Sequence, residues 1–156
     1  MKVSNLLTQD MVISDLDHQE RDDVLMEMVN FLKMRNKISK EKILFEKLVQ
    51  RENLGSTAIG DGVAIPHCKM KSVNDPLVLL AISKDGVDFH SMDESRSHIF
   101  FLVVSSPDSP SLNLQILAAI AHLVRKAETL VKRVLEAKSI PAILDVIREE
   151  ENKINE

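Results

Sequence analysis

His67 is the residue of this 156-residue chain whose surroundings most favour chemistry. Pro66 directly precedes it, and the proline ring holds φ at about −65°, which restrains the backbone that carries the imidazole. Three of the chain's four glycines, Gly55, Gly60 and Gly62, lie shortly before it, where they permit turns that a side chain would obstruct. A neutral imidazole offers one nitrogen lone pair, so His67 can act as a base, a metal ligand or a nucleophile. Spacing alone does not choose among these roles.

Several kinds of site would need companion motifs that the sequence lacks. A zinc site needs further ligands at regular spacing, but there is neither a His-x-x-x-His pair nor a second cysteine. A Gly-x-Ser-x-Gly nucleophile elbow and a Gly-Lys-Ser/Thr phosphate loop are missing as well. We therefore expect no metal and no cofactor. Cys68 beside His67 leaves a thiol nucleophile open as an alternative, which would require a lowered thiol pKa.

The composition narrows the class of partner and the compartment. The formal net charge is −4 and the pI is about 5.7, whereas binding to a phosphate backbone needs clustered Lys and Arg. Aromatic residues are 3% of the chain and all are Phe, so stacking platforms for single-stranded nucleic acid are lacking. No apolar run approaches the ~18 residues of a membrane helix, and the N-terminus lacks a signal-peptide core. We expect a cytoplasmic protein that binds no nucleic acid and does not insert into a membrane.

Helix and strand patterns follow one another along the chain. Apolar residues at helical spacing predict one helix that begins at a capping box on Asp17, and a second with Ser39 as its cap that ends near Arg51. Apolar runs rich in β-branched residues predict central strands at 77–82 and 99–104. Further expected elements are short strands at 12–13, 63–65 and 87–89, a turn at 84–86, a helix over 130–135, and helices capped by Ser111 and Ser139.

This order of elements predicts a fold class. Helices, then strands, then helices indicate an α/β sandwich, with a small mixed β-sheet covered by helices on both faces. The length fits a single domain, which we place at residues 1–150, followed by a charged C-terminal tail at 151–156. The run of charged residues from position 149 onward is expected to fray. The strand order stays open.

The stretch that leads to His67 resembles a known signature. Residues 54–67 read Leu-Gly-Ser-Thr-Ala-Ile-Gly-Asp-Gly-Val-Ala-Ile-Pro-His. This run resembles the phosphorylation site of the fructose/mannitol-type enzyme IIA family of the bacterial phosphotransferase system (PTS), which includes the nitrogen-regulatory enzyme IIA. The motif is long and free of gaps, and the resemblance extends over nearly the whole chain.

The resemblance implies roles for the residues of the motif. It makes the chain a phosphotransferase component in which His67 accepts a phosphoryl group from an HPr-type phosphocarrier and donates it to an enzyme IIB. Arg51 matches the arginine at the start of the family's motif, and its planar guanidinium suits a phosphate clamp. Four residues are expected to support the phosphate loop: Ser56, Thr57, Gly60 and Gly62.

One position departs from the family's pattern. The family's helix after the last strand begins with a second histidine, and this chain has Asn113 at that position. An asparagine can donate to a phosphate oxygen or orient an imidazole, but it cannot carry positive charge. We therefore expect phosphoryl transfer, or its pH profile, to differ from that of a two-histidine site.

The resemblance leaves the biological role open between two uses of one phosphorylated histidine. The phosphate can continue to enzyme IIB for sugar uptake, or the phosphorylation state can control a regulatory target protein in nitrogen- or potassium-type regulation. The chain carries no attached IIB segment, which favours regulation. The contrasting interpretation is a binding module that scaffolds a partner protein and is never phosphorylated.

Overall fold

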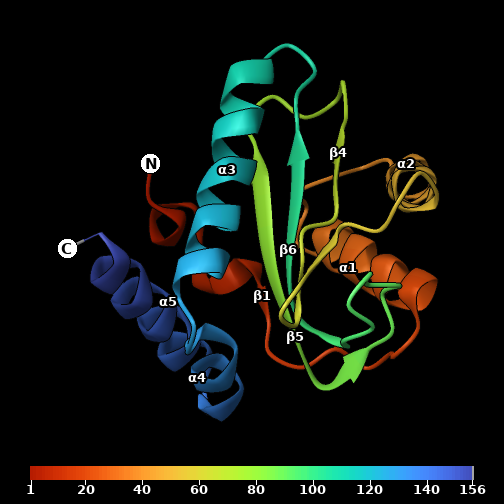
Figure 1. Cartoon of the computed structure of the whole chain (residues 1–156). Coiled ribbons are helices and arrows are strands. Elements are labelled where there is room, and N and C mark those ends of the chain that lie inside the picture. The colour runs from red at the N-terminus through yellow and green to blue at the C-terminus, as the bar shows by residue number, and fades with distance from the viewer. Residues whose placement is uncertain (156) are drawn as a thin grey trace.

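Helices surround a six-stranded sheet in the computed structural model, which describes residues 1–155 (Figure 1). The elements in chain order are the 3-10 turns η1 (Val3–Leu6) and η2 (Gln9–Met11), strand β1 (Val12–Ile13), helices α1 (Arg21–Met34) and α2 (Glu41–Asn53), strands β2 (Ala58–Gly60), β3 (Val63–Ala64), β4 (His67–Lys69), β5 (Leu77–Val87) and β6 (Ser97–Ser105), and helices α3 (Pro110–Lys126), α4 (Leu130–Glu136) and α5 (Ile140–Ile154).

The sheet is mixed and is organised around β6. Its strand order is β1-β5-β6-β3-β2, and β4 pairs with β6 beyond the end of β3. β5 runs antiparallel to β6, whereas β3 and β4 run parallel to it. Because β3 and β4 pair with successive parts of one strand, Val63 lies opposite Ile99 and His67 lies opposite Val103. The register thereby places His67 near the C-terminal end of β6.

The two long strands are buried on both faces, as their unbroken apolar sequences predict. Alternate side chains of β6 point to opposite sides of the sheet. Ile99 and Phe101 belong to one hydrophobic cluster, and Phe100 and Leu102 belong to another. Phe89 packs edge-on against Phe100 with the ring centroids 5.1 Å apart. Each face of the sheet therefore needs its own covering layer.

Helices supply both layers, which confirms the predicted α/β sandwich. Figure 1 shows α3, α4 and α5 on one face of the sheet and α1 and α2 on the other. The predicted apolar face of α1 is fully buried and comprises Val24, Leu25, Met28, Val29 and Leu32. Apolar residues of the other helices are not all buried, since Ile43 on α2 is 45% exposed and Leu114 on α3 is 69% exposed.

Helix starts were predicted less well than helix faces. α1 begins at Arg21 rather than at Asp17, whose backbone N–H donates to the Glu27 carboxylate. α2 begins at Glu41, two residues after the predicted Ser39 cap, and α3 begins before Ser111, at Pro110. The predicted Ser139 cap is confirmed, because its hydroxyl accepts from the N–H of Ala142 at 3.2 Å. At the starts of α1, α2 and α3, by contrast, the residue that precedes the helix makes no side-chain cap bond.

The predicted turn at residues 84–86 is a bulge inside β5. Pairing with β6 breaks after Ile82 and resumes at Val87, which lies opposite Ser97. Gly86 takes φ +85°, a conformation that favours glycine, and its N–H donates to Ser83 Oγ. The local signals of a turn are therefore present, but the strand continues past them.

The expected frayed tail at 151–156 is helical up to Ile154. Glu151 is buried and accepts hydrogen bonds from the backbone N–H groups of Val3 at 2.6 Å and Ser4 at 3.0 Å. The charged residues at the end of the chain suggest a solvated tail. One of them, Glu151, is instead buried and holds the turn η1 in place. The last residue of the chain lies outside the described residues.

Candidate functional site

The ring of His67 is held in one orientation at the start of β4. Its Nδ1 lies 2.7 Å from the carbonyl oxygen of Ile65. A carbonyl oxygen can only accept, so Nδ1 carries the hydrogen and Nε2 keeps its lone pair in the neutral ring. Pro66 between these two residues fixes φ and donates no hydrogen bond, while its carbonyl accepts from Val103 N–H at 2.9 Å. The predicted restraint on His67 is therefore a hydrogen bond as well as a proline.

His67 lines a small cavity of about 230 Å³ at the C-terminal end of β6. The cavity is lined by residues from α2, β4, β6 and α3, namely Arg51, His67, Cys68, Lys69, Val103, Ser105, Asn113 and Leu117. Three residues that the sequence singled out, Arg51, His67 and Asn113, are thus brought together from segments far apart in the chain. A space of this size accommodates a group such as phosphate.

Arg51 reaches the cavity from the last turn of α2. One guanidinium nitrogen, Nη1, donates to the Gly55 carbonyl oxygen at 2.8 Å. This bond uses one of the five N–H donors of the side chain, and the other donors are available to a ligand. The arrangement keeps a permanent positive charge beside His67 with most of its donors free.

Asn113 is buried at the first turn of α3, with 5% of its surface exposed. Its Nδ2 donates to the Ser106 carbonyl oxygen at 2.9 Å, and this bond sets the orientation of the amide. Within residues 1–155 its Oδ1 is buried without a hydrogen-bond partner. Asn113 therefore lines the cavity with an amide whose donor is already used and whose acceptor is buried and unsatisfied, where a protonated histidine would add a donor and a positive charge.

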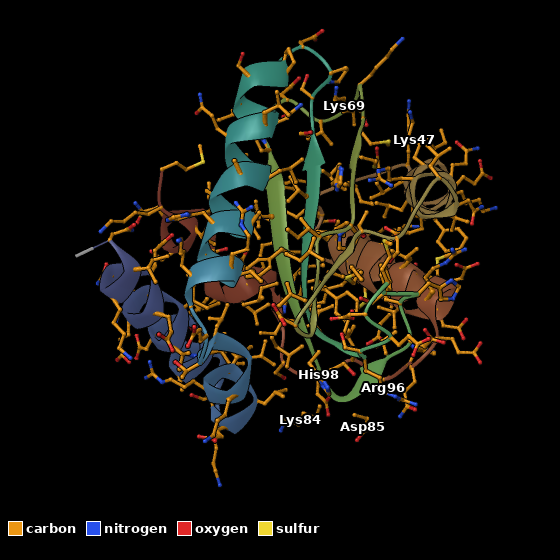
Figure 2. All side chains as sticks on the ribbon, in the orientation of Figure 1. Lys47, Lys69, Lys84, Asp85, Arg96 and His98 are labelled. Atoms are coloured by element: carbon orange, nitrogen blue, oxygen red, sulfur yellow. The ribbon has the colours of Figure 1, made fainter. Side chains whose placement is uncertain are left out.

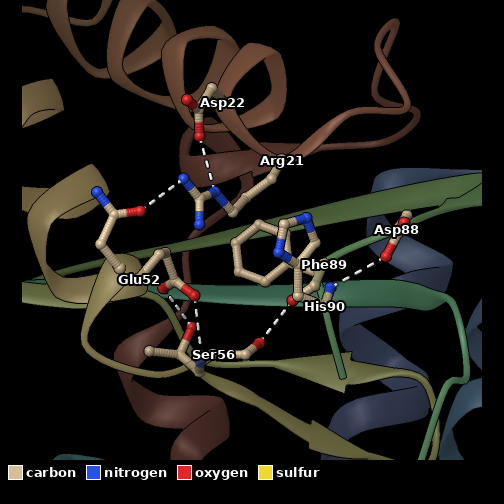
Figure 3. Close-up of polar contacts among 9 residues, drawn as sticks. Arg21, Asp22, Glu52, Ser56, Asp88, Phe89 and His90 are labelled. Carbon is tan, nitrogen blue, oxygen red and sulfur yellow. Dashed lines mark hydrogen bonds and ion pairs between the residues drawn. The ribbon is translucent and has the colours of Figure 1, made fainter. Parts of the chain in front are cut away.

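The hydroxyl groups of Ser56 and Thr57 donate hydrogen bonds within the protein. Ser56 Oγ donates to the Phe89 carbonyl oxygen at 2.5 Å (Figure 3). Thr57 donates to the Glu52 carboxylate twice, from its backbone N–H at 2.9 Å and from its hydroxyl at 2.6 Å. These contacts shape the loop between α2 and β2, so any support for phosphate from the two residues acts through loop geometry.

Gly60 and Gly62 lie away from the cavity, in the turn that joins β2 and β3. Gly60, Asp61 and Gly62 have φ values of +90°, +57° and +84°, and positive φ at both central positions of a two-residue turn is typical of a type I′ hairpin. The Gly62 carbonyl accepts from the N–H of Ile99 at 3.1 Å. Ile99 precedes Val103 by four residues, a span of about 13 Å along β6. A turn of the kind that these glycines permit is therefore present, but Gly60 and Gly62 are not among the residues that line the cavity.

His98 belongs to the same remote end of the sheet. Its Nδ1 lies 2.9 Å from the Ser83 carbonyl oxygen. Figure 2 shows His98 and Lys84 at one end of the sheet and Lys69, which lines the cavity, at the other. His98 therefore does not approach His67.

Cys68 is a poor nucleophile in this setting. Burial raises the pKa of its thiol to about 12, although the Lys47 ammonium nearby opposes the shift. A thiol with that pKa is protonated at neutral pH, whereas reactivity needs the thiolate. The structure therefore disfavours the thiol alternative. Within the described residues, no three His, Cys, Asp or Glu side chains are grouped closely enough to hold a metal ion.

Glu52 is a residue of this region that sequence reasoning missed. Only 4% of its surface is exposed, and it follows Leu44 and Leu48 at intervals of four along α2. That spacing was a usable signal, since it places an acidic residue on the buried stripe of the helix. A buried carboxylate is rarely tolerated without hydrogen-bond partners, which Thr57 supplies here.

Residues 5–150 match the family model for "Phosphoenolpyruvate-dependent sugar phosphotransferase system, EIIA 2". This match covers most of the chain. The chain belongs to this EIIA family of the PTS. Enzyme IIA proteins of this family carry phosphoryl groups in the PTS, as the sequence motif indicated.

Curated relatives fall into two groups by name. The chain is 34% identical over 149 residues to a "PTS system fructose-specific EIIABC component" of Bacillus subtilis, which covers 96% of this chain and 23% of that protein. It is 36% identical over 107 residues to a "Nitrogen regulatory protein" of Bradyrhizobium diazoefficiens, with 69% of each chain covered. The chain therefore spans about a quarter of the EIIABC relative and about two thirds of the nitrogen regulatory relative.

Solved structures agree on the fold. A nitrogen regulatory protein IIA-Ntr from Neisseria meningitidis superposes with a TM-score of 0.84 at 21% identity, covering 93% of this chain and 98% of that one. IIA mannitol from Escherichia coli superposes with a TM-score of 0.76 at 15% identity, covering 90% and 98%. The same EIIA also appears in a complex with phosphorylated enzyme IIB mannitol, with a TM-score of 0.74 at 13% identity, covering 92% and 97%.

No helix among residues 1–155 combines the length and the apolar character needed to cross a bilayer.

Proposed function

We propose that this EIIA-family chain accepts a phosphoryl group on Nε2 of His67 from a phosphohistidine carrier of the HPr type. The observation that carries the proposal is the bond from Nδ1–H to the Ile65 carbonyl oxygen, because it directs the Nε2 lone pair away from the backbone. His67 is half-buried and lines the cavity together with Arg51. The alternative of an unphosphorylated scaffold gives no reason for a fixed tautomer beside a guanidinium that uses one donor on the Gly55 carbonyl.

The transfer step balances without an added reactant. The Nε2 lone pair of His67 attacks phosphorus, a new N–P bond forms, and the N–P bond of the donor breaks. The electron pair of that bond returns to the donor's imidazole nitrogen. Because Nδ1 keeps its hydrogen on the Ile65 carbonyl throughout, no proton has to move in the step. Arg51 stabilises the charge on the transferring oxygens, where preorganised cationic donors act most strongly.

From phospho-His67 we propose two onward uses in the cytoplasm. The phosphoryl group passes to an enzyme IIB in sugar uptake, as the fructose-specific name of one relative and the IIA–IIB complex of one structural neighbour suggest for those proteins. Alternatively, its presence controls the binding of a regulatory target, as the name of the other relative suggests. The unsatisfied acceptor of Asn113 favours the second use, because a site that stabilises its phosphate poorly is suited to reporting the phosphorylation state of its donor.

Phosphorylation can be tested with purified components. The protein is incubated with phosphoenolpyruvate, enzyme I and HPr, and acid-labile phosphate is measured by intact mass spectrometry. We expect one phosphoryl group in the wild type and none in His67→Ala. His122→Ala is the matched control, since His122 is exposed on α3 and should not affect incorporation. Failure of the wild type to take up phosphate from any phosphocarrier would favour the scaffold alternative.

The two onward uses differ in what consumes the phosphate. Phospho-protein prepared in this way is mixed with purified enzyme IIB domains of fructose and mannitol type, and the loss of phosphate from His67 is followed. Rapid transfer to one of them supports the sugar-uptake role. Phosphate that stays on His67 with every IIB, and returns only to HPr, supports the regulatory role.

A further inference from the structure

Glu52 is a buried carboxylate at the C-terminal end of α2 whose two oxygens both face Thr57. Oε1 accepts from the Thr57 backbone N–H at 2.9 Å, and Oε2 accepts from the Thr57 hydroxyl at 2.6 Å. Among the ion pairs of residues 1–155 there is none to this carboxylate, which is 4% exposed. The side chain therefore holds Thr57 at two points with short, charge-assisted bonds.

Thr57 in turn fixes the residue that orients His67. The Thr57 carbonyl oxygen accepts from the Ile65 N–H at 3.0 Å, and the Ile65 carbonyl oxygen accepts from His67 Nδ1 at 2.7 Å. Ile65 is itself buried, with 5% of its surface exposed. A continuous series of hydrogen bonds thus runs from the Glu52 carboxylate through Thr57 and Ile65 to the imidazole.

The same loop also positions the guanidinium. Gly55 lies two residues before Thr57, and its carbonyl oxygen accepts from Arg51 Nη1 at 2.8 Å. The Gly55 N–H donates to the backbone carbonyl of Glu52 at 3.0 Å. Figure 3 shows Glu52 and Ser56 clamping this loop between the end of α2 and the Phe89 carbonyl. The loop therefore connects one buried carboxylate to both the acceptor ring and its cationic neighbour.

We propose that Glu52 is the positioning residue of the phosphoryl-acceptor site: through Thr57 it sets the tautomer of His67 and the placement of Arg51. The proposal rests on the proposed function for its kinetic consequence, but not for its effect on the ring. Glu52 acts on the His67 ring by holding the intervening backbone in place. Ile65 N–H and Ile65 C=O belong to different peptide groups, so the series transmits position rather than charge.

The two hydrogen bonds between Glu52 and Thr57 can be removed together or one at a time by substitution. Glu52→Gln retains an acceptor for the Thr57 N–H, and its amide group can donate to the Thr57 hydroxyl, which reverses its own role. Both contact points survive in that variant. Glu52→Ala removes both, and Thr57→Val removes only the hydroxyl contact while keeping the backbone N–H. The expected disturbance at His67 is therefore largest in Glu52→Ala, smaller in Thr57→Val and smallest in Glu52→Gln.

Glu151 provides a matched control. Like Glu52 it is 4% exposed, and it accepts from backbone N–H groups, those of Val3 and Ser4, and from the Ser4 hydroxyl at 2.8 Å. It lies on α5 and contacts the N-terminal turn rather than the cavity. Glu151→Ala therefore removes a comparable buried carboxylate without touching the series that leads to His67.

The decisive measurement is the nitrogen-15 NMR spectrum of the His67 imidazole in the unphosphorylated protein. It reports which ring nitrogen carries hydrogen and how the ring titrates, and a loss of stability that leaves the protein folded does not change it. We expect a single Nδ1–H tautomer in the wild type, Glu52→Gln and Glu151→Ala, and a mixture of tautomers in Glu52→Ala. Phosphorylation of Glu52→Ala by phospho-HPr should be at least about tenfold slower, since a misplacement near 1 Å can cost more than that.

Each outcome bears on one of the two proposals. A pure Nδ1–H tautomer and a wild-type rate in Glu52→Ala would overturn the positioning role. An equal disturbance of the ring in Glu151→Ala would do so too. If Glu52→Ala does not fold, Thr57→Val decides, and an unchanged ring in that variant counts against the proposal. If no protein in the series is phosphorylated, the proposed function fails, while the tautomer measurement still tests Glu52.

Discussion

Replacing Asn113 by histidine tests what the cavity lacks. Asn113 presents a buried Oδ1 without a partner among residues 1–155, and its Nδ2 is held by the Ser106 carbonyl. In Asn113→His an imidazolium at this position would donate to a phosphoryl oxygen on His67. Hydrogen bonds to charged groups contribute about 1.5–3 kcal/mol. Because about 1.4 kcal/mol is a factor of ten, the phosphorylated state should gain about 10- to 150-fold.

The gain should depend on pH, with a sign that follows from the titration of the introduced ring. An unperturbed imidazole has a pKa of about 6.5, and a neighbouring phosphoryl group raises it. The stabilisation is therefore complete below about pH 6.5 and is lost as the pH rises through the raised pKa. The wild type has no second titrating ring at this position, so its phosphorylation equilibrium should lack that transition.

The assay is the equilibrium between phospho-HPr and the protein, read by intact mass spectrometry from pH 6 to 9 after an alkaline quench. Gln115→His is the matched control, because it adds a histidine to the exposed surface of the same helix, two residues along. We expect a shift in Asn113→His alone. An unchanged equilibrium and pH profile in that variant, with thermal unfolding like that of the wild type, would refute the reasoning.

Three further outcomes follow from individual contacts. Arg51→Lys keeps the charge but loses the planar fork, so phosphorylation of His67 by phospho-HPr should slow by about tenfold, and an unchanged initial rate would contradict the clamp. Burial raises the pKa of the Cys68 thiol to about 12, so iodoacetamide at pH 8 should alkylate it slowly until urea is added; rapid native alkylation would argue against burial. The hydrogen bond to Glu27 raises the pKa of His18, so this pair stabilises the fold fully below about pH 6.5 and progressively less as the pH rises through the raised pKa. Urea midpoints should therefore fall more between pH 6 and 9 in the wild type than in His18→Gln, and parallel profiles would contradict the pair.

Local sequence patterns were enough to predict the fold class and to single out His67. Strands β5 and β6 were predictable because unbroken apolar runs that contain β-branched residues are typical of strands buried on both faces. The β2–β3 hairpin was predictable because glycines at positive φ specify the turn without help from distant residues. His67 followed from the same stretch, since Pro66 and the hairpin restrain its backbone locally.

The ends of helices were harder to predict, because some carboxylates accept hydrogen bonds from residues far away in the sequence. Asp17 could have capped a helix, yet its backbone donates to Glu27 on α1. The charged end of the chain could have been solvated, yet Glu151 binds the N-terminal turn at a sequence separation of 148 residues. Propensity rules weigh neighbours within a few residues, so they are blind to such contacts.

By itself, the sequence determined the family, the histidine that we propose as phosphoryl acceptor and the two-layered covering of a mixed sheet. Only the tertiary structure decided which of the predicted residues share a cavity. The parallel pairing of β4 with the C-terminal end of β6 and the approach of α3 bring Arg51, His67 and Asn113 together. The same register leaves the turn that holds Gly60 and Gly62 beside Ile99, about 13 Å from Val103 toward the N-terminal end of β6. The physical reason is that an extended chain carries neighbouring residues of a motif away from one another. A site is instead assembled from residues that strand pairing and helix packing bring together.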